Sequence, residues 1–157
     1  MLLTRLLNAG HHFPGFVYDA ATLDPATQTT EVEVRPRRGS KPRCSVCSRP
    51  AAGYDHLPER RFEFIPVWGF AVLLQDRMRR VQCATREIKV ERVPWAMGKH
   101  SLTRAYRLYL AQWARKLSWA ETARNFHTSW EKVYQAVEYA VRWGLERPRL
   151  NPRHRRR

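Results

Sequence analysis

The chain is poor in acidic residues: 14 Asp and Glu stand against 29 Lys and Arg, which gives its 157 residues a formal net charge of +15. It contains no run of about 18 apolar residues, so the sequence excludes a membrane-spanning helix. Residues 1–7 are too short an apolar stretch, and too soon interrupted, to form a signal peptide. So basic a chain favours a polyanionic partner such as nucleic acid over a generically basic surface or a ribosomal-type role.

Cysteine is scarce as well. The three cysteines form an odd set that fits a reducing cytoplasm better than a disulfide scaffold, and we expect a cytoplasmic protein. The sequence has no glycine-rich phosphate loop, no ordered Ser/His/Asp set and no spaced carboxylate trio for two-metal phosphoryl chemistry. These absences predict a protein that binds its partner and is not an enzyme.

The distribution of proline and glycine divides the chain near Gly98. Short runs of alternating apolar and polar residues before it predict strands at 15–20, at 29–35, two or three within 60–83, and one ending before Pro94. Beyond it, apolar residues at helical spacing predict helices at about 101–113, 119–126 and 130–143. The expected fold is α+β: a small antiparallel β-rich, zinc-ribbon-like domain over 1–98, a three-helix domain over 99–146, and a basic disordered tail over 147–157.

Two helix-start signatures follow each other in the helical half. Ser118 is followed three residues later by Glu121, and Thr128 three residues later by Glu131, which is the pattern of a capping box. One short helix and a turn at His127 separate them, and this spacing predicts a helix-turn-helix. The inward-facing residues are expected to be Ala120, Ala123, Phe126, Val133, Val137, Ala140 and Val141.

In a helix-turn-helix the second helix enters the DNA major groove, so its outward face should carry base-reading side chains. Lysine suits guanine acceptors or phosphate, glutamine suits adenine edges, and serine suits phosphate. The expected DNA-binding residues are Arg124, Ser129, Trp130, Lys132, Tyr134 and Gln135. Arg104, Arg107 and the terminal arginines are expected to contact phosphates. The alternative is a plain three-helix bundle with caps and no role in DNA binding.

The cysteines have metal-ligand spacing. Cys44 and Cys47 form a C-x-x-C pair, and Cys83 is placed to join them from a neighbouring hairpin, as in a zinc ribbon. The residue three positions after Cys83 is Arg86, whose fixed positive charge prevents coordination. A fourth ligand would have to be His56, Glu87, His100 or water, so partial zinc binding and no metal binding both remain open.

From about Tyr18 to Glu146 the chain resembles the N-terminal portion of bacterial insertion-sequence transposases of the IS-L-three class. The likeness rests on Cys44-Ser45-Val46-Cys47, Arg79-Arg80-Val81-Gln82-Cys83, Val90-Glu91-Arg92-Val93-Pro94-Trp95-Ala96 and Gly98-Lys99-His100. The resemblance implies a four-cysteine zinc-binding domain, with Cys44, Cys47 and Cys83 as three ligands and Arg86 in place of the fourth. It also implies a helix-turn-helix that binds the terminal inverted repeats of the element.

In that family an RNase H-like catalytic domain with three metal-binding carboxylates follows the third helix. Here the similarity stops near Glu146 and an Arg/Pro-rich tail ends the sequence. We therefore expect a truncated transposase that binds double-stranded DNA without cutting it, alone, as a homo-oligomer or with full-length transposase, and away from membranes. Two alternatives are a non-specific basic RNA- or nucleic-acid-binding protein, and a non-binding remnant that only pairs with intact transposase.

Overall fold

The computed structural model describes residues 2–85 and 87–146, and the chain has an α+β fold. The chain has two compact units, Met1–Ala105 and Tyr106–Arg157. The boundary lies within a helix, whereas the sequence analysis placed it in the loop after Gly98. The expected tail over 147–157 lies outside the described residues.

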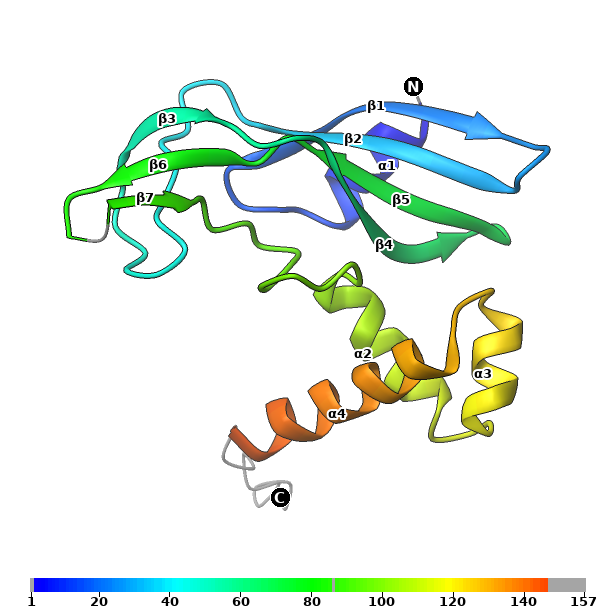
Figure 1. The fold of residues 1–157 in the computed structure, drawn as a ribbon. Coiled ribbons are helices and arrows are strands. Elements are labelled where there is room, and N and C mark those ends of the chain that lie inside the picture. The colour runs from blue at the N-terminus through cyan, green and yellow to red at the C-terminus, as the bar shows by residue number, and fades with distance from the viewer. Residues whose placement is uncertain (1, 86, 147–157) are drawn as a thin grey trace, which may run out of the picture. The chain divides into compact units, whose positions relative to one another are not determined.

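The first unit contains a four-stranded sheet in the order β1-β2-β5-β4 (Figure 1). The central pair, β2 and β5, is parallel, and the two outer pairs are antiparallel. Helix α1 packs against β1. The elements are α1 (Leu2–Gly10), β1 (Phe16–Asp24), β2 (Thr29–Pro36), β4 (Arg60–Val67) and β5 (Phe70–Asp76).

The core of this unit follows from the alternation seen in the sequence. In β2 the side chains of Val32 and Val34 are buried while Glu33 between them points outward, which is the strand period. Trp95 is 1 % exposed and lies 4.8 Å from Phe16 between ring centroids. Such aromatic packing supplies much of the buried area of a small sheet domain.

The same unit contains a three-stranded antiparallel sheet in the order β3-β6-β7. Its strands are β3 (Ala52–His56), β6 (Arg79–Cys83) and β7 (Glu87–Val90). Strand β3, which the sequence analysis did not predict, contains Gly53 and four exposed or half-exposed neighbours, so it carries no alternating signal.

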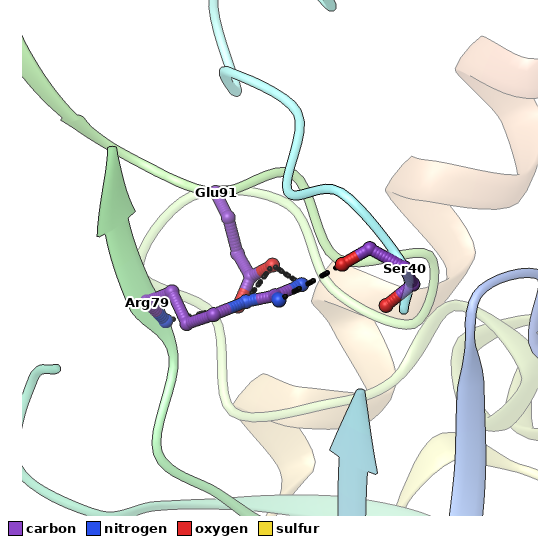
Figure 2. A network of polar contacts seen from close by, with 3 residues as sticks. All are labelled: Ser40, Arg79 and Glu91. Atoms are coloured by element: carbon purple, nitrogen blue, oxygen red, sulfur yellow. Dashed lines mark hydrogen bonds and ion pairs between the residues drawn. The ribbon is translucent and has the colours of Figure 1, made fainter. Parts of the chain in front are cut away.

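A buried ion pair ties this second sheet to the segment that follows it. Arg79 Nε donates to both Glu91 carboxylate oxygens, at 3.1 Å to Oε1 and 2.9 Å to Oε2, and Nη2 donates to Oε2 at 2.7 Å. Arg79 Nη1 donates to the Ser40 carbonyl oxygen at 3.4 Å (Figure 2). The Glu91 side chain is 1 % exposed. Removing one partner of such a pair would leave an uncompensated buried charge, which is strongly destabilising.

The second unit is helical. Helix α2 (Arg104–Trp113) crosses the boundary and is followed by α3 (Trp119–Asn125) and α4 (Trp130–Glu146). The three helices correspond to those predicted over 101–113, 119–126 and 130–143. Among the helices that the structure describes, none is long and apolar enough to cross a membrane.

Candidate functional site

Helix α3 begins with the predicted capping box. The Ser118 hydroxyl accepts a hydrogen bond from the Glu121 backbone N–H at 3.2 Å, and the Glu121 carboxylate accepts one from the Ser118 N–H at 2.9 Å. The bond with the Ser118 hydroxyl, followed by that with its backbone, lowers the pKa of Glu121. Two N–H groups that a helix end leaves unpaired are thereby satisfied.

The turn between α3 and α4 is tight. His127 has φ +49°, which lies in the left-handed region. The N–H groups of His127 and Thr128 donate to the carbonyl oxygens of Arg124 and Ala123, at 3.3 Å and 3.0 Å. These bonds close the end of α3 and redirect the chain into α4 within a few residues.

The second predicted cap is wrong by one residue. Helix α4 is capped by Ser129, whose hydroxyl accepts from the Lys132 N–H at 3.3 Å. The Thr128 hydroxyl is buried without a hydrogen-bond partner. The spacing to Glu131 selects Thr128, because the residue three positions after Ser129 is Lys132. A hydroxyl alone is enough for an N-cap, however, so the neighbouring Ser129 can take this role. The backbone bond from the Val133 N–H to the Ser129 carbonyl fixes the choice.

The predicted inward faces are partly wrong as well. Ala120 is exposed, and its place in the buried face of α3 is taken by Thr122. The Thr122 hydroxyl donates to the Ser118 carbonyl at 3.0 Å, which satisfies this polar group inside the core. In α4, Ala136 is fully buried whereas Val141 is 56 % exposed.

The remaining inward-facing predictions agree with the structure more closely. Ala123 and Val133 are buried, and Phe126, Val137 and Ala140 are half-buried. Phe126 caps α3, and its ring lies 5.3 Å from that of Tyr109 between centroids. The small side chain of Ala123 at the α3–α4 contact allows the two helices to approach closely.

The candidate DNA-reading residues lie at the end of α3, in the turn before α4 and in the first two turns of α4. Lys132 is half-buried, and the other five are exposed: Arg124, Ser129, Trp130, Tyr134 and Gln135. The structure thus brings most of the predicted set to the surface around one helix N-terminus. Unpaired N–H groups and the helix dipole make such an end favourable for phosphate.

Three aromatic rings cluster at this end, of which sequence reasoning identified only two. The rings of Trp119, Trp130 and Tyr134 lie 5.8 Å to 6.0 Å apart between centroids. Trp130 is 50 % exposed and Tyr134 is 45 % exposed. The missed member, Trp119, follows the Ser118 cap directly, just as Trp130 follows Ser129, and this repetition was the available signal.

Arg107 does not have the phosphate-contact role expected of it. It is 7 % exposed, and its guanidinium lies 5.0 Å from the centre of the Tyr139 ring. Burial lowers the pKa of Arg107, and the nearby Tyr139 opposes this. Arg107 is therefore part of the helical core, where a cation–π contact compensates the charge. Arg104 is exposed, and the terminal arginines lie outside the described residues.

The three cysteines lie together in the first unit. Their sulfur atoms all lie within 4.8 Å of one another, and those of Cys47 and Cys83 are 3.5 Å apart. Cys44 is fully buried and Cys83 is nearly so. Thiolates at three corners of a tetrahedron about a metal would stand about 3.8 Å apart. The cluster could therefore bind a metal ion.

The loop around Cys44 is held by backbone bonds. The Cys44 N–H donates to the Arg49 carbonyl at 3.0 Å, and the Ser48 N–H donates to the Cys44 carbonyl at 2.9 Å. Hydrogen bonds from the Thr85 side chain and then from its backbone lower the pKa of Cys83 to about 6. A thiol with a lowered pKa is readily available as the thiolate that coordinates metal.

The structure does not bring a described fourth ligand to the cluster. Glu87 pairs with Cys83 across β6 and β7, but it is exposed and its carboxylate is not grouped with the sulfur atoms. Neither His56 nor His100 belongs to the described group. Arg86 lies outside the described residues. Of the four candidates named for the fourth ligand, water therefore remains.

Comparisons with known proteins add no assignment to this geometry. No protein-family model, curated protein or solved structure matches the chain. The functions open to the chain are therefore inferred from its own residues: the exposed end of α4, the cysteine cluster, and the excess of positive charge.

Proposed function

We propose that this chain binds double-stranded DNA with sequence preference through α3 and α4, which form a helix-turn-helix with α4 in the major groove. The observation that carries the proposal is the cluster of exposed polar and aromatic side chains around the start of α4, directly after the tight turn at His127. A helix of 17 residues is about 25 Å long. It is narrow enough for the major groove, which is about 12 Å wide.

The side chains at this end have complementary tasks in the proposed complex. Gln135 is exposed and suits an adenine edge, while Ser129 and Arg124 suit phosphates on either side. Trp130 and Tyr134 offer apolar contact area, for which a thymine methyl group is a suitable partner. Lys132 lies one turn from Gln135 and would contact guanine or phosphate.

The acidic residues of α4 are compatible with this role. The Glu138 carboxylate accepts a hydrogen bond from Arg142 at 2.6 Å, which neutralises it locally. Glu131 bonds with its own backbone N–H and with the Ser129 side chain, and both contacts lower its pKa. A carboxylate held in the groove can accept from a cytosine amino group, so Glu131 does not oppose specific binding.

We propose further that Cys44, Cys47 and Cys83 hold zinc. Three thiolates form a soft ligand set that selects zinc over magnesium or calcium. The bound ion would join the Cys44–Cys47 loop to strand β6, and water would complete the coordination. This proposal and the previous one agree with the resemblance to transposase N-terminal regions, for which the natural DNA target would be the terminal inverted repeats of an element.

The test of DNA binding is selection from random duplexes at moderate salt, followed by sequencing of the retained DNA. We expect an enriched motif of a few base pairs, and its loss in K132A/Q135A. The matched control is Q112A/K116A, which removes the same residue types from exposed positions at the end of α2 and in the turn after it. Retention without enrichment would refute sequence reading and favour non-specific binding by charge. Equal loss of enrichment in both double variants would exclude the proposed role of α4.

A further inference from the structure

Positive charge is concentrated in the loop before and around the cysteine pair. Residues 35–54 contain no Asp or Glu, and their six cationic side chains are all exposed. Arg35 lies in β2 and forms an ion pair with Asp19 at 2.9 Å. The other five are Arg37, Arg38, Lys41, Arg43 and Arg49. Among the residues that the structure describes, no carboxylate pairs with these five, and we call residues 37–50 the basic loop.

Two guanidinium groups converge on one serine in this loop. Arg92 donates to the Ser48 hydroxyl at 2.8 Å, and Arg43 donates to the Ser48 carbonyl at 3.1 Å. The backbones of the two arginines are also bonded, from the Arg92 N–H to the Arg43 carbonyl at 2.7 Å. The serine is in the left-handed conformation, with φ +60°. The convergence therefore joins segments separated by 44 residues.

This arrangement lacks a negative charge. Each guanidinium has five N–H donors, and one hydrogen bond from each reaches Ser48. Two exposed cations held at one residue repel each other, and within the described part of the chain neither has a carboxylate partner. An anion with several acceptor oxygens would relieve the repulsion and use the remaining donors. Phosphate fits this requirement because arginine binds it through paired, parallel hydrogen bonds.

We propose that Arg43 and Arg92, with Ser48 between them, form a phosphate-binding clamp for the DNA backbone, in addition to the contacts of α3 and α4. This inference rests on the proposed DNA binding. A polymer fits better than free phosphate because the exposed cations Arg37, Arg38 and Arg49 continue the charge along the basic loop. Phosphate contacts position a protein on DNA without reading sequence, so the clamp contributes affinity and not specificity.

The test is the salt dependence of binding of the full chain to a mixed-sequence DNA duplex. Binding is measured by fluorescence anisotropy. Each lost phosphate contact reduces the slope of log K against log salt by about 0.9. We expect R43Q/R92Q to reduce the slope by about 1.8 and to weaken binding at least 10-fold at moderate salt. R43K/R92K should restore most of the slope because it keeps the charge.

The matched control is R35Q/R61Q, which removes the same charge from arginines already paired with Asp19 and Glu31. We expect this control to change the slope by less than half as much. Equal changes in both double variants, or no change in R43Q/R92Q while wild type binds, would overturn the clamp. A failure of R43K/R92K to restore the salt slope would also overturn it, because the slope depends on the two charges that lysine keeps. Tighter, equally arginine-dependent binding to duplex RNA would reassign the polyanion.

The outcomes separate the two proposals. Loss of sequence enrichment in K132A/Q135A with an unchanged slope in R43Q/R92Q would support DNA reading by α4 and refute the clamp. A reduced slope in R43Q/R92Q without any enriched motif in wild type would support the clamp and refute sequence reading. A wild-type chain that retains no duplex would refute both.

Discussion

Replacement of Asp76 by asparagine should stabilise the protein at alkaline pH. Asp76 ends β5, is 3 % exposed, and has one carboxylate oxygen, Oδ2, without a hydrogen-bond partner. Burial, and then the nearby charge of Glu91, raises the pKa of Asp76 from 3.8 to about 7, although Arg79 and the Arg77 backbone oppose the shift. Between about pH 4 and pH 7, Asp76 therefore keeps its proton in the folded state but has lost it in the unfolded state.

The sign and the size of the effect follow from proton linkage. Because the folded-state pKa is raised, the favourable contribution of protonated Asp76 is complete below about pH 4 and is lost as pH rises through about 7. A shift of about three pKa units corresponds to about 4 kcal/mol, at about 1.4 kcal/mol per unit. Asparagine mimics the neutral form, so D76N should match wild type near pH 4 and exceed it by about 2 to 4 kcal/mol at pH 8.

The assay is urea unfolding at pH 4.5, 6 and 8, followed through the Trp95 indole resonance by NMR. Trp95 is 1 % exposed in the core of the same unit, so its resonance reports unfolding of that unit. The control is D19N, because Arg35 lowers the pKa of Asp19 chiefly through a side-chain hydrogen bond. The favourable contribution of ionised Asp19 is complete above about pH 4, so D19N should be less stable than wild type by an amount that stays nearly the same from pH 4.5 to 8. A wild-type stability that stays level from pH 4.5 to 8, or a D76N effect independent of pH, would refute the reasoning.

Three further changes test the local geometry. H127G should raise the free energy of unfolding of the helical unit by about 0.5 to 1 kcal/mol, because glycine adopts the φ of +49° without steric cost; a lower midpoint in thermal unfolding would contradict this. S129A should cost about 1 kcal/mol by removing the α4 cap, whereas T128A should cost less because its hydroxyl has no partner; equal losses in urea unfolding would show that the cap is shared. C83S should abolish stoichiometric zinc uptake, measured by metal analysis after dialysis, because it removes one of three thiolates; uptake equal to wild type would place the metal elsewhere.

The sequence predicted those elements whose pattern is set by their own residues. The α3 capping box depends on two residues three positions apart, and it formed as expected. Alternation in β2 and helical spacing in α4 likewise reflect local periodicity. The association of Cys83 with the C-x-x-C pair was inferred from ligand chemistry, and the sulfur atoms do meet.

The remaining features depend on contacts between distant residues. Strand β3 exists because β6 pairs with it, and its own residues show no alternation. The burial of Arg107 depends on Tyr139 lying opposite its guanidinium, 32 positions along the chain. The convergence of Arg43 and Arg92 on Ser48 requires the backbone bond between two separate segments. Residue spacing in the sequence does not predict such long-range contacts, because tertiary packing overrides local preference.

The distribution of paired and unpaired arginines explains why the net charge of +15 is informative about function. Several strand arginines are paired with carboxylates, so their charge is compensated within the protein and is less available to a partner. These pairs are Arg35–Asp19, Arg61–Glu31, Arg79–Glu91 and Arg80–Asp55. The described cations of the basic loop and Arg92 have no such match. An exposed cation without a carboxylate partner gains no ion-pair energy within the protein. The concentration of such cations beside the cysteine cluster is therefore explained better by a polyanionic partner than by the requirements of folding.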